Sequence, residues 1–399
     1  MKQLSRRGFF KTAAVSAAVF NIVPAKVLGQ DAPSKKIVMA AIGVGGQGSG
    51  NMRAFMGLPD VLVRACCDVN TRKMENFKKT VDERYGNNDC LMIKDFREVC
   101  ERKDIDAVMI GTPDHWHSVI GCYAASRGKD IYGEKPFTHN LREGRMLVNA
   151  IHRNGRVFQA GSWQRSTDNF RRAVELVRNG RIGKITRIEI GLPVGGRGPA
   201  ARPGIAVPAE LDWDMWLGPA PAREYQGVCD FHWRWVLDWG GGQMLDWICH
   251  HADIVLWAVK KDHIGPDEIE GHGLFEASGI YDSPTKYRYV CRYGDGLEIV
   301  VADQSQLEMG MGTRWFGEDG KWVWVTRGAQ KTSDPKIWDM RPEAGEFRLP
   351  NNSGHFADFI KSVKERTLAT APAETSHRIT SMGHLGQIAM ITGRKIRWD

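Results

Sequence analysis

The chain has 399 residues, of which 42% are hydrophobic and 26% are charged, and its formal net charge is +8 at pH 7. This composition excludes fibrous and disordered proteins, and the length is enough for two domains with a sizeable core. A nucleic-acid partner is not predicted, because most of the excess positive charge lies in the first 29 residues, which hold Lys2, Arg6, Arg7, Lys11 and Lys26 and no acid.

The N-terminal segment, residues 1–29, has the features of a twin-arginine export signal in the right order. The pair Arg6-Arg7 precedes a weakly apolar stretch over 12–23 and a small-residue exit over 27–29. We predict export by this route, to the periplasm or the cell surface; a basic helix of the mature protein is the alternative. No stretch approaches about 18 uninterrupted apolar residues, so no stable membrane insertion is expected after signal removal.

The eight cysteines show neither Cys-x-x-Cys pairs nor zinc-ligand spacing. Twin-arginine substrates cross the membrane already folded, so export does not require disulfides. We therefore predict buried thiols, no disulfide framework and no metal site.

Residues 36–162 alternate short β-branched runs with helical patterns of 10 to 15 residues. This alternation predicts βαβ units and a doubly wound parallel sheet, an α/β Rossmann domain. The predicted strands are 37–42, 61–67, 107–110, 130–132 and 156–160, and the predicted helices are 71–85, 118–127 and 141–154.

Residues 163–399 have a different pattern. After a helix over 169–179, the strand-like runs lack helices of matching spacing between them, which predicts a mostly antiparallel sheet in an α+β domain. Residues 195–208 are a Gly, Pro and Arg-rich loop that can reach toward a ligand. The tail over 355–399 is helical and is expected to pack back on the body. The predicted strands are 184–192, 287–292, 297–301 and 321–325.

The first predicted strand runs directly into a glycine-rich turn, GVGGQG. Gly43 suits the tight turn, Gly45 lets the backbone approach a pyrophosphate, and Gly48 allows close packing of helix on strand. The following helix N-terminus offers free amides to the phosphates. We assign Gly46 and Gln47 to the same cofactor site.

Asp68 ends the second predicted strand, 20 residues after Gly48. A carboxylate there accepts hydrogen bonds from the adenosine ribose hydroxyls and repels a 2′-phosphate, so NAD is favoured over NADP. Arg72 is close enough in sequence to reach such a phosphate, which keeps NADP as the alternative.

Two further motifs follow strands of the predicted sheet, at the edge where ligands bind in such folds: TPDHWH over 112–117 and GEKP over 133–136. Thr112, Pro113 and Glu134 are assigned to the cofactor site with Lys135. Because Lys135 ends a strand facing the cofactor crevice, a functional role is favoured over a solvated surface role.

The segment GGGQMLDWICHH over 240–251 predicts a helix that starts near Gly242. Asp246 and His250 then lie one turn apart on one face, with Asp253 on the same side. Such a pair can ligate a metal, form a structural hydrogen bond or act as an oriented acid and base. Metal is disfavoured because no third ligand stands at a familiar spacing.

Beside a nucleotide site the acid/base interpretation is preferred, because oxidising an alcohol needs a base for the hydroxyl proton. We assign His250 as the base and Asp246 as its orienter. Lys135 holds or polarises the reacting oxygen, with its pKa lowered by burial.

The motifs GVGGQG, TPDHWH, GEKP and GGGQMLDWICHH and the ending GHLGQIAMITGRKIRWD, in this order, resemble the glucose-fructose oxidoreductase/inositol dehydrogenase/rhizopine-catabolism family (Gfo/Idh/MocA). The resemblance covers essentially everything after the signal. It implies a Rossmann domain over 36–162, followed over 163–399 by a domain for substrate binding and oligomerisation with a large open-faced sheet. By family pattern Lys135, Asp246 and His250 are catalytic and His117 lies close to the nicotinamide. It also implies a homo-oligomer, a dimer or a tetramer.

Ten of the 14 tryptophans lie between residues 213 and 324, five of them within 213–239. Buried tryptophans are ordinarily core, yet flat aromatic faces also stack on sugar rings, so a carbohydrate pocket that includes Trp239 is predicted. Gln164, Arg165 and His232 are expected to add hydrogen bonds to hydroxyls.

The leading hypothesis is hydride transfer between NAD and a sugar or sugar-derived alcohol. Free nicotinamide cofactor is scarce outside the cytoplasm, so an exported enzyme is expected to hold its cofactor tightly. The second hypothesis is an NAD-dependent glycoside hydrolase that works by transient oxidation, elimination and re-reduction; such enzymes often lack the Glu-Lys-Pro motif present here. The third, a non-catalytic sugar sensor, is disfavoured because the Lys135, Asp246 and His250 set is intact.

Overall fold

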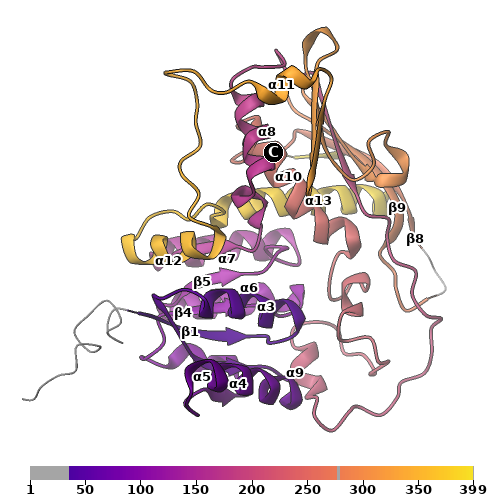
Figure 1. The fold of residues 1–399 in the computed structure, drawn as a ribbon. Coiled ribbons are helices and arrows are strands. Elements are labelled where there is room, and N and C mark those ends of the chain that lie inside the picture. Colours follow the sequence, from indigo (N-terminus) through magenta and orange to yellow (C-terminus); the bar gives the residue numbers. More distant parts are fainter. Residues whose placement is uncertain (1–35, 276–278, 399) are drawn as a thin grey trace, which may run out of the picture. The chain divides into compact units, whose positions relative to one another are not determined.

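The computed structural model describes residues 36–275 and 279–398. The predicted export signal lies outside the described residues. Two sheets organise the chain that follows (Figure 1). No helix in the described ranges is both long and apolar enough to cross a bilayer.

The first sheet has six parallel strands in the order β3-β2-β1-β4-β5-β6, the doubly wound order of a Rossmann domain. The predicted parallel sheet is therefore confirmed. The third strand was not predicted, because it has only three residues and none is buried. The strands are β1 (Ile37–Ile42), β2 (Val61–Cys67), β3 (Leu91–Ile93), β4 (Ala107–Ile110), β5 (Asp130–Gly133) and β6 (Phe158–Ala160).

Helices cover both faces of this sheet. One face packs against α5 (Phe96–Glu101), α6 (Asp114–Ser126) and α7 (Leu141–Arg153). The other packs against α3 (Gly46–Met56), α4 (Thr71–Tyr85) and α12 (His355–Glu365). The last of these comes from the far end of the chain (Figure 1). Its Phe359 ring lies 5.8 Å from that of Phe55 in α3. The C-terminal tail thus completes a layer of the N-terminal domain.

Local signals explain the helix ends. The side chain of Asn70 accepts a hydrogen bond from the Lys73 amide and begins α4, and Gly86 ends it with a φ of +66°. Helix α6 begins at Asp114, four residues before the predicted start at residue 118. Its N-cap is Pro113, and an acidic residue in the first turn suits the helix dipole.

The second sheet has eight strands in the order β13-β12-β11-β7-β10-β9-β8-β14. Every pair is antiparallel except β7 with β10, which is parallel, so the mostly antiparallel sheet is confirmed. The strands are β7 (Arg187–Leu192), β8 (Glu268–Phe275), β9 (Pro284–Arg292), β10 (Glu298–Asp303), β11 (Gly312–Phe316), β12 (Trp322–Thr326), β13 (Ala329–Thr332) and β14 (Ile396–Arg397).

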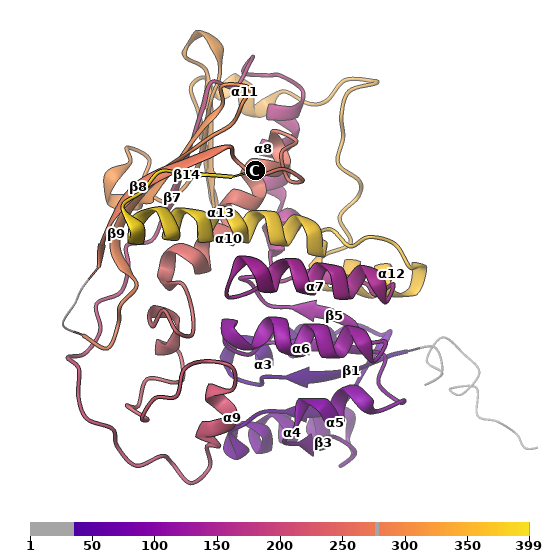
Figure 2. The same cartoon turned by 180° about the vertical axis from the view of Figure 1, so that it is seen from behind.

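Three long helices pack on this sheet through one shared core: α8 (Asp168–Arg178), α10 (Gly242–Ala258) and α13 (Ala373–Thr392). Figure 2 shows α13 running between the eight-stranded sheet and α7 of the first domain. The two domains are therefore joined by packed helices as well as by the chain.

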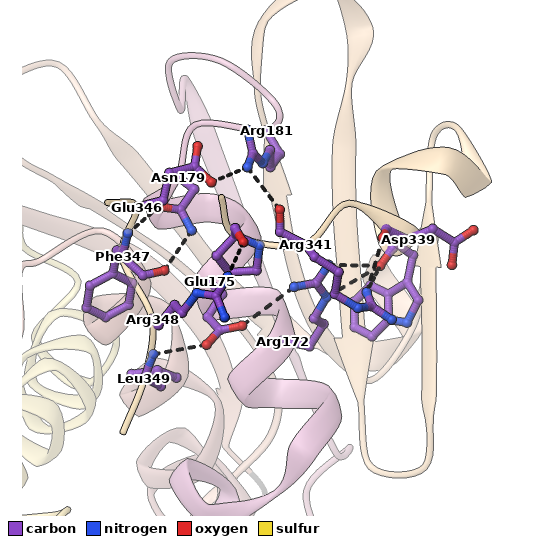
Figure 3. A network of polar contacts seen from close by, with 12 residues as sticks. Arg172, Glu175, Asn179, Arg181, Asp339, Arg341, Glu346, Phe347, Arg348 and Leu349 are labelled. Atoms are coloured by element: carbon purple, nitrogen blue, oxygen red, sulfur yellow. Dashed lines mark hydrogen bonds and ion pairs between the residues drawn. The ribbon is translucent and has the colours of Figure 1, made fainter. Parts of the chain in front are cut away.

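The irregular stretch that follows α11 (Pro335–Asp339) is fixed to α8 by polar contacts (Figure 3). The Asn179 amide exchanges two hydrogen bonds of 2.9 Å with the backbone of Phe347. The Glu175 carboxylate accepts a hydrogen bond from the Leu349 amide, also at 2.9 Å. These contacts satisfy backbone groups that have no sheet partner.

Candidate active site

The glycine turn between β1 and α3 has the steric requirements that its sequence predicted. Gly43 has a φ of +84°, and a Cβ there would lie 2.6 Å from the carbonyl carbon of Gly111. A Cβ on Gly48 would lie 2.0 Å from the oxygen of Gly43, so this position must stay bare for the helix to approach the strand. A Cβ on Gly45 or Gly46 would meet nothing within 4 Å. The turn therefore presents bare backbone to open space, as pyrophosphate binding requires.

Asp68 braces this turn. Its Oδ2 accepts a hydrogen bond from the Val44 amide at 2.8 Å, and its Oδ1 accepts one from the Asn70 amide at 2.9 Å. Burial raises the pKa of Asp68, and these hydrogen bonds oppose the rise. Each oxygen keeps a lone pair for a ribose hydroxyl, so the turn and the acid together fit the adenosine half of a dinucleotide.

A cavity of about 550 Å³ opens at the glycine turn, within the size range of cofactor sites. The end of β2 and the segments around Thr112-Pro113 and Glu134-Lys135 form its Rossmann side. The opposite side comes from residues 209–235, here called the roof segment. The roof residues that line the cavity are Leu211, Met215, Trp216, Cys229, Asp230, Phe231, Trp233 and Arg234.

The roof segment is attached to the Rossmann domain at several points around the cavity. Two backbone hydrogen bonds of 2.9 Å join it to the loop after β2, an ion pair joins it to α4, and the Trp216 carbonyl accepts a hydrogen bond from the Trp116 indole at 3.0 Å. The two backbone hydrogen bonds join Thr71 to Glu210 and Asp212 to Val69, and the ion pair joins Lys73 to Asp230. The cofactor cavity is thus closed by a part of the chain that lies outside the Rossmann domain.

Lys135 lines this cavity and contacts Asp246, which lies behind it and does not line the cavity. The Lys135 Nζ donates to Asp246 Oδ1 at 2.6 Å, and both side chains are 13% exposed. Arg234 from the roof segment adds a second cation, with its Nε 3.4 Å from the same oxygen. Although burial raises the pKa of a carboxyl, Lys135 and Arg234 together lower the pKa of Asp246 below its ordinary value.

The expected lowering of the Lys135 pKa is wrong. Burial does oppose the charge, but the carboxylates of Asp246 and Glu134 outweigh it and raise the pKa above the ordinary value. Lys135 therefore remains an ammonium group. It can stabilise negative charge on an oxygen but cannot act as a base at neutral pH.

His250 lies one turn beyond Asp246 on α10, as the sequence predicted, and is 4% exposed. Within the described residues it makes no hydrogen bond to Asp246, and its Nδ1 is buried without a partner. The predicted orienting role of Asp246 is thus corrected, because the carboxylate is engaged by two cations. Burial, followed by the charges of Lys135 and Arg327, lowers the pKa of His250 well below its ordinary value. The ring is neutral at pH 7.

The remaining predicted cofactor residues divide into two groups. Thr112, Pro113, Gln47 and Glu134 line the cavity, and the Glu134 Oε1 accepts a hydrogen bond from Asn51 at 2.6 Å. His117 does not line it. Its ring nitrogens lie 2.7 Å from the Pro136 oxygen and 2.9 Å from the Thr112 oxygen. The ring therefore connects the backbones of the TPDHWH and GEKP motifs.

Two of the predicted sugar-binding residues, Arg165 and Trp239, make their contacts in the protein interior. Arg165 is 4% exposed and forms buried ion pairs with Asp253 at 2.6 Å and Asp262 at 3.3 Å. Trp239 is 1% exposed and meets the Trp216 ring edge-on at 4.8 Å, within an aromatic core that holds all five tryptophans of 213–239. Neither side chain can reach a ligand, because both are buried in the interior of the protein.

The other two are differently placed. Gln164 is fully buried, and both atoms of its side-chain amide lack a hydrogen-bond partner among the described residues. His232 is exposed and contacts the Tyr281 hydroxyl through Nδ1. Gln164 therefore has hydrogen-bonding groups that no described residue satisfies, but it does not line the cavity, and its predicted contact with a hydroxyl stays a prediction.

Sequence reasoning missed two polar groups of the site. Arg234 lies between tryptophans in a segment that carried no recognised motif. Asp114 stands in the TPDHWH motif, but nothing marked it as a neighbour of Lys135 and Asp246. It is 3% exposed and its Oδ1 has no partner in the described structure. Burial, reinforced by Asp246, raises the pKa of Asp114 well above its usual range.

No group of three or more His, Cys, Asp or Glu side chains in the described ranges is arranged to hold a metal ion. The parallel sheet, the glycine turn, its acid and the adjoining cavity define a dinucleotide-binding α/β protein. Two family models match this chain. Residues 37–162 match an oxidoreductase family's NAD-binding Rossmann fold, and residues 195–399 match an oxidoreductase family's C-terminal alpha/beta domain. The chain belongs to the Gfo/Idh/MocA family of oxidoreductases, as its motifs predicted.

Among curated relatives, a glycosyl hydrolase family 109 protein of Shewanella pealeana is 26% identical over 211 residues, covering 46% of this chain and 44% of the relative. The chain spans less than half the length of the curated relatives it matches. The structure of GenD2 from gentamicin A biosynthesis, in complex with NAD, has a TM-score of 0.67 and 17% identity, covering 92% of this chain and 97% of that one. The aldose-aldose oxidoreductase of Caulobacter crescentus, complexed with glycerol, has a TM-score of 0.65 and 16% identity, covering 91% and 100%. These likenesses establish the shared fold.

Proposed function

We propose that the protein is an NAD-dependent oxidoreductase that transfers hydride between a sugar or sugar-derived alcohol and a tightly held nicotinamide cofactor. The observation that carries this proposal is the ion pair between Lys135, which lines the dinucleotide cavity, and Asp246, with neutral His250 one helical turn further along α10. The names of two similar proteins, an aldose-aldose oxidoreductase and a glycosyl hydrolase, support a sugar or sugar-derived substrate.

Each residue has a distinct task. Bound NAD would supply the hydride acceptor for the carbon that carries the reacting hydroxyl. Neutral His250 accepts the hydroxyl proton, which its low pKa permits at neutral pH. The ammonium group of Lys135 stabilises the negative charge that develops on the oxygen, and Asp246 holds that ammonium in place.

The cavity favours NAD over NADP and favours retention of the cofactor. Asp68 presents a carboxylate where a 2′-phosphate would lie, and the nearby cation Lys73 is paired with Asp230. The roof segment covers the cavity from the opposite side, so release of the dinucleotide requires its attachments to open. A retained cofactor suits reactions that restore it in every cycle.

The proposal is tested by purifying the protein, measuring bound NAD(H) per chain, and following absorbance at 340 nm with a panel of sugars and polyols. Lys135→Met and His250→Ala are expected to lower kcat by about 10²-fold or more while NAD stays bound. His263→Ala is the matched control, because that ring is 70% exposed. Full turnover in both site variants would refute the mechanism.

A glycoside hydrolase is the second candidate, favoured by the name of the family 109 relative. In that reaction one hydroxyl is oxidised, the glycosidic group is eliminated, water adds, and the hydroxyl is restored, so no net redox change results. Adding aryl glycosides to the same assay separates the two. Released aglycone without net NADH indicates the hydrolase, whereas NADH that accumulates with free sugars indicates the dehydrogenase.

We further propose that residues 1–29 direct export by the twin-arginine route and that the chain forms a dimer or tetramer. The eight-stranded sheet supports the proposal of a dimer or tetramer. Helices α8, α10 and α13 share the core on one of its faces, and we expect a second copy of the chain to pack on the opposite face. Light scattering coupled to gel filtration measures the oligomeric state directly.

A further inference from the structure

Arg327 lies in the turn between β12 and β13, beside the catalytic helix. Its guanidinium carbon is 4.5 Å from the centroid of the Trp163 ring and 4.5 Å from that of the Trp247 ring. Trp247 is the neighbour of Asp246 on α10, and its ring lies 5.4 Å from that of His250. The positive charge of Arg327 is close enough to contribute to the low pKa of His250. Arg327 therefore borders the site where a substrate would meet the base.

The position of this turn is fixed. The Asn169 side-chain nitrogen, at the start of α8, donates to the Thr326 oxygen at 2.8 Å and to the Ala329 oxygen at 3.2 Å. Gly328, in the turn itself, has a φ of +73°. These features hold the turn against α8 and present Arg327 toward α10.

The guanidinium of Arg327 lacks the partners that comparable groups in this chain have. Its Nε and Nη2 are buried without a hydrogen-bond acceptor among the described residues, and it forms no ion pair with a described carboxylate. Two other arginines lie between pairs of aromatic rings in the same way. Arg314 contacts Phe316 and Trp322, and Arg234 contacts Phe231 and Trp233.

Both of those arginines do have a carboxylate. Arg314 pairs with Glu308 at 2.8 Å, and Arg234 lies 3.4 Å from Asp246. The Arg314 Nε also lacks an acceptor among the described residues, so the missing carboxylate is what sets Arg327 apart and calls for an explanation. For Arg327 the explanation consistent with its place beside His250 is an acceptor brought by the ligand.

The charges around the site point in the same direction. Lys135 and Arg234 share the carboxylate of Asp246, and Glu134 is a second carboxylate beside Lys135. Burial raises the pKa of Asp114, which disfavours the charged form of that acid. With Arg327 added, cations exceed anions beside the base. Such a surplus favours a negatively charged substrate.

We propose that Arg327 is a specificity-determining residue that binds an acidic group, a carboxylate in the simplest case, on the sugar substrate. The planar fork of arginine matches a carboxylate with two parallel hydrogen bonds, and the Trp163 and Trp247 rings keep that fork in one plane. The inference rests on the proposed sugar-directed function and narrows it to sugar acids, such as uronates and their derivatives.

The test is calorimetric titration of the NAD-loaded protein with matched pairs that differ only at the terminal carbon: D-glucuronate with D-glucose, D-galacturonate with D-galactose, and D-mannuronate with D-mannose. The acidic member of at least one pair is expected to bind about 10- to 100-fold more tightly than its neutral partner, the scale of hydrogen bonds to a charged group. Arg327→Met, which fills the space between the two rings without charge, is expected to abolish that preference. Arg327→Lys is expected to retain only part of it.

Arg314→Met is the matched control, because it makes the same change between two aromatic rings at a position with its own carboxylate. It is expected to leave the preference unchanged. Equal binding of acidic and neutral partners by the unaltered protein, or a preference that survives in Arg327→Met, overturns the inference. Because binding is measured without turnover, the outcome is independent of the 340 nm assay. A protein that prefers uronates but transfers no hydride would refute the proposed function and leave this inference standing.

Discussion

Among single residues, Asp246 shows how charge determines which side chains a buried carboxylate contacts. Its spacing from His250 suits a helical pair, yet the structure gives its carboxylate to Lys135 and Arg234. Two cations stabilise a buried carboxylate more than a neutral imidazole does. His250 is consequently left as an unpaired, neutral ring, which is the form required of a base.

This arrangement predicts the pH dependence of the reaction. The pKa of His250 is lowered, so the neutral form persists as the pH falls, and kcat/KM is lost only below the ordinary histidine range near 6.5. In Arg327→Met a nearby cation is gone, so the pKa of His250 rises and the acid limb moves to higher pH. The profile of kcat/KM against pH measures both. An acid limb at or above pH 6.5 in the unaltered protein contradicts the assignment.

Arg165 gives a second prediction at this scale. It holds Asp253 and Asp262 in the interior, so Arg165→Met leaves two buried carboxylates without their cation. The free energy of unfolding is expected to fall by about 3–5 kcal/mol, measured by urea denaturation. If stability is unchanged and KM for the sugar rises instead, Arg165 contacts substrate as its sequence position suggested.

At the level of elements, α3 contains two glycines with opposite requirements. Gly48→Ala places a methyl group 2.0 Å from the Gly43 oxygen, so the helix must move off the strand and NAD binding should be lost. Gly50→Ala meets nothing within 4 Å and should stabilise the helix by about 1 kcal/mol. Bound NAD per purified chain and the Tm of each variant test the pair. Retention of stoichiometric NAD by Gly48→Ala would show that the turn is more plastic than its geometry implies.

The roof segment is the element that sequence reasoning did not foresee. Periodic helices and strands reveal themselves in sequence, as α10 did when its start at Gly242 was predicted. The roof has little regular structure, and its tryptophans were interpreted as a sugar platform. Its five tryptophans pack into one buried core, and two of them, Trp216 and Trp233, also line the cavity. Contacts such as Lys73 with Asp230, 157 residues apart in sequence, have no local signature.

The same limit applies to the substrate side. Lys135, Asp246 and His250 could be singled out because each residue stands in a motif at a strand end or on one helix face, and their catalytic roles stay predictions. Arg234 and Arg327 come from irregular segments, and only the fold brings them to the site. Strands β8, β11 and β13 escaped prediction for a related reason, since they are short or glycine-containing.

The roof also carries a prediction. Asp230→Asn removes its ion pair with Lys73, so NAD should dissociate faster. The pair is partly exposed, with side chains 36% and 70% accessible, and such pairs contribute modestly, so an increase of about two- to fivefold is expected. Loss of NADH fluorescence during dilution measures the rate. Asp214→Asn, at an exposed position on the same segment, should leave the rate of NAD dissociation unchanged. An equal increase in that variant would argue against a role of the Lys73–Asp230 ion pair in retaining the cofactor.

For the whole molecule, folding, cofactor binding and the predicted export are linked. The tail helix α12 completes a layer of the Rossmann domain, and the roof segment from the C-terminal half closes its cavity. The cofactor site is therefore complete only when the entire chain has folded. All eight cysteines are free in the part of the chain that the structure describes, and burial raises the pKa of thiols such as that of Cys249 to about 12.

These features predict that the chain acquires NAD in the cytoplasm and carries it through the twin-arginine route. Expressed in a bacterium that has this translocase, the protein should appear in the periplasmic fraction with about one NAD(H) per chain, because mass action stabilises the loaded, folded form. Arg6→Lys combined with Arg7→Lys should leave an equally NAD-loaded protein in the cytoplasm. Gly48→Ala, which cannot hold the cofactor, should be exported less. Periplasmic protein that contains no NAD, or export of the double lysine variant at the normal level, would contradict this account.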